Sequence, residues 1–323
     1  MEHIEKISVV IITKNEPRLR YTLESLVNQT FKPHEIIIVV DTERDLGIDI
    51  AEQFKNFLPI KTVLNKYGFG VGGARATGVE ISSGDIIAFI DSDCIADDKW
   101  LETIAATFRR HKDIYAVTGK NVEIPYEANS KISEPHEKER FVTFALTQNF
   151  AIRRDLIDLV GNFDPWFKHG GEDYDFCVRI VSKGLRILYE PRAIVYHWRR
   201  GFRESIEKAW KDGSSRAYVF LKHGFKVLKD ASIMIFHGST LMIFVPLLIL
   251  SLVMNSPMAM LAISWILLSV THRIYRAILM SQDSIKTLPI NILRSLFAYI
   301  SSTAFIITIF KERVLDYKRC LSR

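Results

Sequence analysis

The sequence predicts an α/β fold, in which a mostly parallel sheet carries helices on both faces, followed by C-terminal helices that cross a membrane. Segments of strand and helix character alternate through the N-terminal part of the 323-residue chain. A buried strand at Ile86–Ile90 then runs into two aspartates, Asp91 and Asp93. Two apolar runs of about 20 residues follow near the C-terminus, which is the length needed to cross a bilayer.

The N-terminal elements follow from local pattern. The β-branched run Ser8–Thr13 predicts a strand, and the polar turn Lys14–Pro17 ends it. Leucines at positions 19, 23 and 26 then lie on one face of a predicted helix. Apolar runs at Glu35–Val40 and Ile60–Asn65 predict the second and third strands, so strands and helices alternate as in a parallel sheet.

A glycine-rich turn, Gly68–Gly73 (GFGVGG), follows the third strand and leads into a helix that begins near Ala74 and Arg75. It lacks the Gly-Lys-Ser/Thr ending of a Walker phosphate loop. It also differs from the dinucleotide-binding pattern, which follows the first strand of a sheet. The turn alone therefore assigns no ligand.

Asp91 and Asp93 directly follow a strand at its carboxyl end, where open α/β sheets bind ligands. An extended chain would point both side chains to the same side. Two converging carboxylates can hold a hard divalent cation that still has room for phosphate oxygens. The alternative is a helix-capping loop, because Asp and Ser are favoured in turns and caps.

A second acidic cluster, Glu172, Asp173 and Asp175, follows His169-Gly170-Gly171 at the predicted start of a helix. Acidic residues in a first helical turn are stabilised by the helix dipole, so capping alone would account for them.

Six segments together resemble the family 2 glycosyltransferases, which have the GT-A fold. They read SVVIITKNE, QTFKPHEIIIVVD, NKYGFGVGGARATG, GDIIAFIDSDC, HGGEDYDFCVRIVSKG and LYEPRAIVYHW, occur in the family's order and cover about residues 6 to 230. The resemblance implies a GT-A, Rossmann-like sheet flanked by helices. It also implies a nucleotide-diphosphate sugar as donor, and we favour a UDP-sugar over a GDP-sugar.

The resemblance assigns one set of residues to the donor. It places Thr13, Asn15, Glu16 and Asp41 around the base and ribose, Asn65 and Arg75 beside the nucleotide, and Asp91, Ser92 and Asp93 in the DxD motif that carries the metal and the diphosphate. His197 becomes a further metal ligand beside Asp91 and Asp93, although a single His is more often structural. Either Mn²⁺ or Mg²⁺ suits the carboxylates, and the imidazole favours Mn²⁺.

The resemblance assigns a second set of residues to the acceptor. Asp173 becomes the general base, since an inverting transfer needs a carboxylate to take the acceptor proton as the new bond forms. Glu172, Trp198, Arg199 and Arg200 are expected near the acceptor or a phosphate, because arginine pairs well with phosphate. A solvated basic face is the alternative for the arginines.

Charge and hydropathy divide the chain into three expected parts. These are a catalytic domain at residues 1–200, a basic interfacial helix region at 201–230 and a membrane domain at 231–323. Between Arg199 and Asp230 there are nine basic and four acidic residues, interleaved with aromatic ones. This composition is typical of a helix on a membrane surface.

The membrane domain is predicted to contain a helical hairpin. Its spans lie near 233–253 and 258–279, separated only by Met254–Pro257. A further apolar helix near 288–310 is interrupted by polar residues and followed by a basic tail. Crossing would place that tail outside, against the positive-inside tendency, so we expect an interfacial helix, with three spans as the alternative.

These features predict a cell-membrane enzyme whose catalytic domain lies in the cytoplasm, since the N-terminal apolar run is a core strand rather than a signal peptide. The expected acceptor is a polyprenyl or dolichyl phosphate- or diphosphate-linked glycan, with no nucleic acid partner because the apolar runs favour lipid. The alternatives are a polyprenyl-phosphate sugar synthase, a processive polysaccharide synthase and, from another class, a nucleotidyltransferase. The three cysteines suggest neither a disulfide framework nor a metal site.

Overall fold

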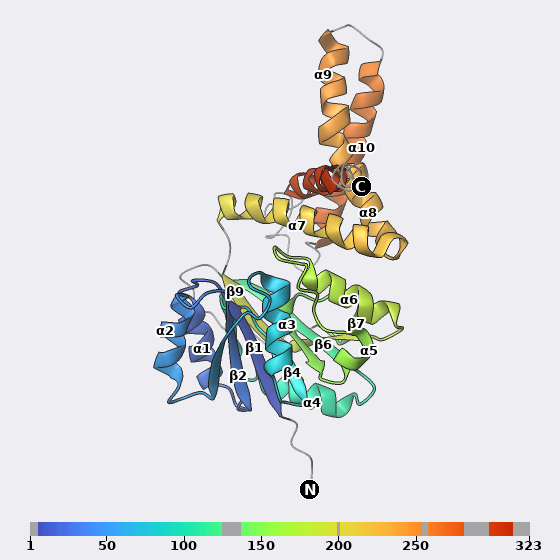
Figure 1. Ribbon diagram of the computed structural model, residues 1–323. Coiled ribbons are helices and arrows are strands. Elements are labelled where there is room, and N and C mark those ends of the chain that lie inside the picture. Colours follow the sequence, from blue (N-terminus) through green and yellow to red (C-terminus); the bar gives the residue numbers. More distant parts are fainter. Residues whose placement is uncertain (1–5, 125–136, 199–200, 254–257, 281–296, 313–323) are drawn as a thin grey trace, which may run out of the picture. The chain divides into compact units, whose positions relative to one another are not determined.

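The computed structural model describes residues 6–124, 137–198, 201–253, 258–280 and 297–312. The chain divides into two compact units, Met1–Arg199 and Arg200–Arg323. The first unit contains a sheet with helices on both of its faces, and the second unit is helical (Figure 1).

The sheet of the first unit is mixed and mostly parallel, as predicted. Four parallel strands form one side of it in the order β3 (Ile60–Leu64), β2 (Glu35–Val40), β1 (Ile7–Thr13) and β4 (Ile86–Phe89). All six residues of β2 are buried, and β-branched residues predominate there. A strand buried on both faces is continuously apolar for this reason, and the apolar runs therefore predicted these strands well.

The other side of the sheet mixes strand directions. β8 (Phe150–Arg153) runs antiparallel to both β4 and β6 (Ala116–Ile124), and β6 pairs in parallel with the long strand β9 (Ile187–Trp198). Two short strands, β5 (Cys94–Ala96) and β7 (Arg140–Val142), pair antiparallel with β9. The pairing of β5 with β9 brings the segment after β4 back to the end of β9.

Helices cover both faces of the sheet and close two apolar cores. One face carries α1 (Leu19–Val27), α2 (Leu46–Phe54) and α4 (Trp100–Arg110), and the other carries α3 (Val71–Ile81), α5 (Leu156–Val160) and α6 (Glu172–Ser182). Alternate residues of β1 divide between these cores, with Val9 and Ile11 in the first and Val10 in the second. Successive side chains of a strand point to opposite faces, so one strand serves both cores.

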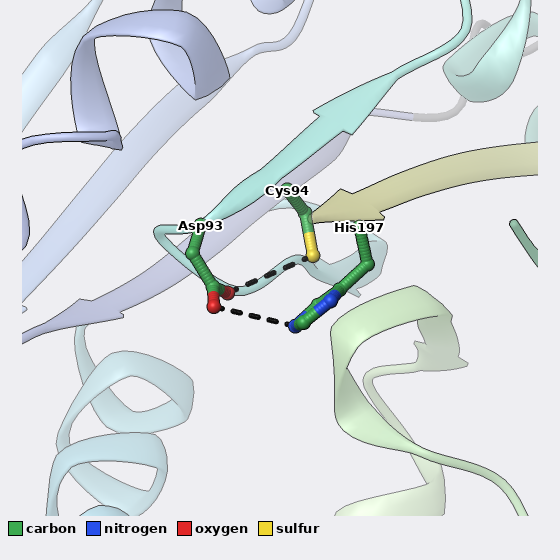
Figure 2. Close-up of side chains that lie close together, drawn as sticks. All are labelled: Asp93, Cys94 and His197. Atoms are coloured by element: carbon green, nitrogen blue, oxygen red, sulfur yellow. Dashed lines mark hydrogen bonds and ion pairs between the residues drawn. The ribbon is translucent and has the colours of Figure 1, made fainter. Parts of the chain in front are cut away.

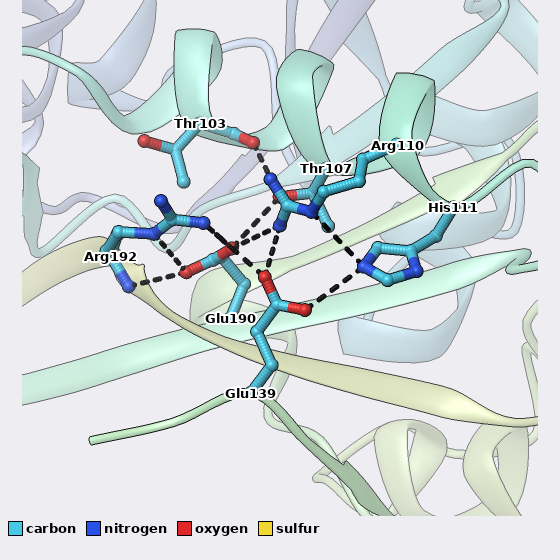
Figure 3. A network of polar contacts seen from close by, with 7 residues as sticks. All are labelled: Thr103, Thr107, Arg110, His111, Glu139, Glu190 and Arg192. Carbon is cyan, nitrogen blue, oxygen red and sulfur yellow. Dashed lines mark hydrogen bonds and ion pairs between the residues drawn. The ribbon is translucent and has the colours of Figure 1, made fainter.

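A bulge in β9 is held by the buried side chain of Glu190. The register between β6 and β9 shifts between Gly119 and Lys120. Glu190 accepts hydrogen bonds from the backbone N–H of Arg192 at 3.0 Å and from its guanidinium at 2.7 Å, and it pairs with Arg110 at 3.0 Å (Figure 3). A bulge re-aims the strand beyond it, and here that part of β9 carries His197.

The second unit contains helices with apolar, exposed surfaces. Its elements are α7 (Phe202–His223), α8 (Leu228–Ser239), a π-helical turn (Thr240–Phe244), α9 (Val245–Val253), α10 (Met258–Met280) and a helix over 297–312. The stretches Ser232–Ser251 and Met258–Ile278 are long and apolar enough to cross a membrane, and only 28% and 11% of their most apolar windows are buried. The two predicted spans are therefore present as helices.

The third predicted apolar helix, near 288–310, is helical from residue 297. Its first part, the turn between the two spans and the basic tail lie outside the described residues.

Candidate active site

The predicted nucleotide-binding residues gather at the carboxyl edge of the parallel strands. Thr13 ends β1, Asp41 follows β2 and Asn65 follows β3. Asn65 donates a hydrogen bond to Asp41 at 2.9 Å, and the Asp41 carboxylate also accepts from the N–H of Gly70 at 3.2 Å. The Oγ1 atom of Thr13 is buried without a hydrogen-bond partner among the described residues. A bound polar ligand would satisfy it.

Asn15 and Glu16, on the loop after β1, have local partners. Asn15 has a left-handed backbone with φ 52°. Its N–H donates a hydrogen bond to the Asp45 carboxylate at 2.9 Å, and its side-chain oxygen accepts one from the N–H of Leu46 at 3.0 Å. Glu16 pairs with Arg18 at 2.7 Å. Arg18 in turn lies 3.8 Å from Asp93, so this loop reaches the DxD segment.

The glycine-rich turn packs against the loop that precedes α6. The N–H groups of Val71 and Gly72 donate to the carbonyls of Lys168 and Phe167, at 3.2 and 2.9 Å. A Cβ on Gly72 would lie 2.3 Å from the carbonyl oxygen of Asp164. We conclude that the glycines permit close backbone approach here.

Asp93 and His197 meet at the end of β9, and Cys94 lies beside them. The Nε2 of His197 is 3.2 Å from an oxygen of Asp93, and the Sγ of Cys94 is 3.9 Å from the other oxygen (Figure 2). One ligand atom from each of the three residues lies within 4.8 Å of the others. Cys94 is directly opposite His197 in the β5–β9 ladder, which explains why their side chains share one face.

Asp91 and Asp93 contact different partners, and the segment that carries them is not the extended chain expected from the sequence. The segment after β4 is a turn, closed by a hydrogen bond from the N–H of Cys94 to the carbonyl of Asp91 at 3.2 Å. Asp91 therefore contacts Arg75 at 2.9 Å and lies outside the Asp93–Cys94–His197 group. Ser92 contributes its carbonyl, which accepts from the hydroxyl of Thr22 at 3.0 Å.

Arg75 connects Asp91 to the second acidic cluster. Its side chain is buried, and its guanidinium pairs with both Asp91 and Glu172. Burial lowers the pKa of Arg75, but the charges of Glu172, Asp91 and Asp173 outweigh burial and raise it. One guanidinium therefore faces three carboxyl groups, and this excess of acidic groups favours a further cation in the site.

Glu172 is the carboxyl group most affected by this crowding. Burial is the largest cause that raises its pKa, to about 7, with the charges of Asp173 and Asp91 adding to it and Arg75 acting in the opposite direction. Its second oxygen has no hydrogen-bond partner among the described residues. Glu172 thus pairs with Arg75.

Asp173 is partly exposed at the start of α6. Gly170 and Gly171 precede the helix with φ angles of 123° and 97°, which glycine adopts at low cost. The Asp173 carboxylate accepts from the N–H of Tyr174 at 2.7 Å. Asp175 is fully buried and pairs with Arg179 at 3.0 Å, so it has a structural position.

Trp198 ends β9 beside His197 and is buried. Its ring packs against that of Tyr21, with centroids 5.4 Å apart. Arg199 and Arg200 lie outside the described residues.

The distances in the Asp93–His197 pair suit a shared metal ion. Two ligand atoms about 2.0–2.3 Å from one cation lie roughly 3 Å apart when they are adjacent in its coordination shell. The 3.2 Å between Asp93 and His197 agrees with this spacing. Cys94 was not predicted as a neighbour of this pair, because nothing in the local sequence gives the register between β5 and β9.

Comparison with known families returns one assignment over most of the chain. The family described as Glycosyl transferase family 2 matches residues 8–163, and Glycosyl transferase family group 2 matches residues 86–310. A Glucosyl-dolichyl phosphate glucuronosyltransferase of Haloferax volcanii is 28% identical over 217 residues, which cover 59% of this chain and 69% of the relative. The Escherichia coli UDP-Glc:alpha-D-GlcNAc-diphosphoundecaprenol beta-1,3-glucosyltransferase WfaP is 29% identical over 189 residues. These residues cover 57% of this chain and 73% of the relative.

Solved structures share the fold at low sequence identity. S. aureus TarS 1–349 in complex with UDP-GlcNAc has a TM-score of 0.53 and 16% identity, and the match covers 95% of this chain and 91% of that one. GalNAc-T7 with UDP, GalNAc and Mn²⁺ has a TM-score of 0.51 and 19% identity, and the match covers 62% of this chain and 44% of that one.

Proposed function

Because this chain belongs to the family 2 glycosyltransferases, we propose that it moves a sugar from a nucleotide-diphosphate sugar to a lipid-linked acceptor, with inversion at the anomeric carbon. The acceptor is a polyprenyl or dolichyl lipid that carries its glycan on a phosphate or diphosphate. Two relatives support this class, because their names contain dolichyl phosphate and diphosphoundecaprenol.

The observation that carries the proposal is a series of side-chain contacts and sequence neighbours at the carboxyl edge of the sheet. Arg75 contacts both Asp91 and Glu172, and Asp173 follows Glu172 directly on α6. Asp91 in turn lies two residues before Asp93, which contacts His197. This series joins the cation site, a buried arginine and the exposed carboxylate on α6. Sugar transfer between two substrates needs these three functions in one place.

On the donor side, Asp93 and His197 would hold a divalent cation, with Asp91 nearer the ribose or joined to the metal through water. Mn²⁺ suits the imidazole better than Mg²⁺, and a structural neighbour was solved with UDP and Mn²⁺. When bound, the metal would neutralise negative charge on the leaving diphosphate. Thr13, Asn15, Glu16, Asp41 and Asn65 are the proposed base and ribose contacts, and a UDP-sugar is the proposed donor.

On the acceptor side, Asp173 is the proposed general base. The acceptor oxygen attacks the anomeric carbon and loses its proton to the Asp173 carboxylate while the diphosphate leaves from the opposite face. Glu172 holds Arg75, and through it Asp91, and so acts as a positioning residue for the donor side. Trp198, Arg199 and Arg200 are proposed to lie near a phosphate of either substrate.

The second unit supports a lipid acceptor, because it presents two apolar helices that are long enough to cross a bilayer. We propose a catalytic domain at residues 1–200 on the cytoplasmic side, an interfacial region at 201–230 and a membrane domain at 231–323. This arrangement would concentrate the enzyme at the surface where isoprenoid lipids lie.

The test is a donor screen against a membrane lipid extract, with the full-length protein in detergent and mass spectrometry of the lipids. UDP-sugars, GDP-mannose and nucleoside triphosphates are each supplied with Mn²⁺ or with EDTA. We expect one sugar to be added to an isoprenoid-linked glycan, with release of the nucleoside diphosphate, only when metal is present.

Other products would contradict specific parts of the proposal. Addition to bare polyprenyl phosphate identifies a polyprenyl-phosphate sugar synthase, and repeated additions identify a processive synthase. Product only on a soluble acceptor contradicts the lipid acceptor, and transfer of a nucleotide instead of a sugar contradicts the reaction class.

A further inference from the structure

A polar cluster lies among the apolar helices of the second unit. His237 on α8 is fully buried, and its ring nitrogens lie 2.8 Å from the hydroxyl of Ser269 and 2.9 Å from a ring nitrogen of His272, both on α10. Ser269 also contacts the hydroxyl of Tyr299, on the 297–312 helix, at 2.9 Å. Three helices therefore meet around hydrogen-bonding side chains that are costly to place in an apolar setting.

Arg273 is the charged member of this cluster and has no carboxylate partner among the described residues. Its closest polar contact is the hydroxyl of Ser302 at 3.4 Å, and its guanidinium lies 5.6 Å from the centre of the Tyr299 ring. Its Nε atom is buried, and no hydrogen-bond partner for it lies in the part of the chain that the structure describes. Arg276 and Arg216 act on it electrostatically with the same sign of charge, whereas Tyr299 acts in the opposite direction.

A partly buried cation among other cations needs an anion from elsewhere. Removing a charge from water is costly unless an opposite charge and hydrogen bonds replace the water. Tyr299 and Ser302 supply neither an opposite charge nor a partner for Nε. A guanidinium in this setting is suited to pairing with an anionic ligand.

The cluster lies near one end of the predicted hairpin, inside both apolar stretches. His237 is five residues after Ser232, where the first apolar stretch begins, and Arg273 is five residues before Ile278, where the second ends. At a rise of 1.5 Å per residue, both lie about 7–8 Å inside the same end of the hairpin. Ile235 and Ile274, on the same helices, have exposed side chains and offer apolar contact beside the cluster.

We propose that Arg273, with His237, His272 and Tyr299, forms a binding site for the phosphate of an isoprenoid lipid. This inference rests on the proposed function, since it assigns the phosphate of the lipid-linked acceptor to named residues. Arginine suits the site because its planar guanidinium donates two parallel hydrogen bonds to phosphate oxygens. The imidazole of His272 would add a neutral donor, His237 and Tyr299 hold the hydrogen-bond network behind it, and the exposed isoleucines would contact the isoprenoid chain.

The test is a binding titration on the full-length protein in phosphatidylcholine nanodiscs, with geranylgeranyl phosphate as the probe. We expect wild-type protein to bind it and Arg273→Gln to bind it roughly tenfold or more weakly, because a charge-assisted hydrogen bond is lost. Arg273→Lys keeps the charge without the planar fork and should lie between the two. Arg276→Gln is the matched control, because Arg276 is an exposed arginine one turn further along α10, and it should change affinity by less than about threefold.

Phosphatidylglycerol and inorganic phosphate, titrated in parallel, distinguish the possible ligands. The proposal is overturned if wild type does not bind geranylgeranyl phosphate, or if Arg273→Gln and Arg276→Gln weaken binding equally. It is also overturned if phosphatidylglycerol binds as tightly as the probe, since the cluster would then hold bulk lipid.

UDP binding, measured on each preparation, reports the catalytic unit independently and should be unchanged in all variants. If Arg273→Gln does not fold, Arg273→Lys takes its place. Binding of geranylgeranyl phosphate that is weaker in Arg273→Lys than in wild type supports the site, and equal binding contradicts it. The proposed function can fail separately: transfer only to a soluble acceptor would contradict it even where the probe binds through Arg273.

Discussion

At the scale of single residues, the two aspartates of the DxD segment have different partners. Asp93 contacts His197, whereas Asp91 contacts the buried Arg75. The difference arises from the turn at 91–94, which ends the extended chain before the second aspartate. Asp93 is therefore the more direct candidate metal ligand, and Asp91 is held in place by a guanidinium.

Replacing Asp93 with Ala should abolish sugar transfer and the Mn²⁺-dependent part of nucleotide binding, because the pair with His197 is lost. The fold should survive, since the Asp93 side chain is partly exposed. Calorimetric titration of UDP with and without Mn²⁺ measures the effect, with circular dichroism as the control for folding. Wild-type transfer in the presence of EDTA would contradict a metal-dependent donor site.

Glu172 should contribute to stability through its buried pair with Arg75. Removing one partner of a buried ion pair is destabilising, and Glu172→Ala should cost about 3 kcal/mol, the low end of the usual range because Asp91 still contacts Arg75. Denaturant unfolding of the full chain in detergent measures this. Glu80→Ala is the control, since the Glu80–Lys66 pair is partly exposed and should cost less than about 1 kcal/mol. Equal losses would contradict a special role for the buried pair.

Long-range pairs are what the sequence could not predict at this scale. Local patterns marked Asp91, Asp93, Glu172 and Asp173 as candidate site residues. The Arg75–Glu172 contact joins residues 97 positions apart, so no spacing along the chain indicates it. Cys94 was missed for the same reason, because only the register of β5 against β9 brings its thiol beside His197.

At the scale of the elements, the bulge in β9 depends on an ionised Glu190. Burial raises its pKa, but hydrogen bonds from the side chain and backbone of Arg192 outweigh burial and lower the pKa from 4.5 to about 2. A carboxyl group with a lowered folded-state pKa adds stability above its unfolded pKa. That contribution is lost as the pH falls from about 4.5 toward 2.

Glu190→Gln should therefore lower the free energy of unfolding at pH 7, and the difference from wild type should shrink between about pH 4.5 and pH 2. Denaturant midpoints of both proteins across this range measure the effect. Asp113→Asn is a suitable control, because Asp113 forms an exposed pair with Arg186 and should change little. A difference for Glu190→Gln that stays constant with pH would contradict this explanation.

The predicted parallel strands agree with the structure because their burial on both faces imposes a continuous apolar pattern. β2 begins and ends where the sequence predicts. The glycine-rich turn is different. Its glycines leave room for the backbone of the loop at Asp164, Phe167 and Lys168, which lies about a hundred residues away in the sequence. Composition alone could therefore identify the turn but not its partner.

At the scale of the whole molecule, the basic residues of α7 should matter for transfer to a lipid. Lys208 and Lys211 are exposed on this helix. Changing both to Glu should weaken transfer to lipid acceptor in anionic bilayers more than in neutral ones, because each basic residue near an anionic surface contributes about 1 kcal/mol. Transfer rates in vesicles with and without phosphatidylglycerol measure this. Equal rates in both vesicles for the variant and wild type would show that α7 does not act through the membrane surface.

The hydropathy of the chain predicted the two apolar helices of the second unit, since length and composition alone define such segments. It could not predict the polar cluster around His237, because His272, Arg273 and Tyr299 come together only when three helices pack. The same reasoning applies to the π-helical turn at Thr240–Phe244, which lies inside the first apolar stretch without a local sequence signal.

The central claim is that Asp173 takes the acceptor proton in a transfer from a nucleotide sugar. The most direct measurement compares transfer rate and donor affinity in wild type and Asp173→Asn, which keeps the shape of the side chain and removes its basicity. We expect the rate to fall about 10²–10⁴-fold with donor affinity unchanged. Transfer by Asp173→Asn at the wild-type rate would contradict the claim, and the base would have to be another group.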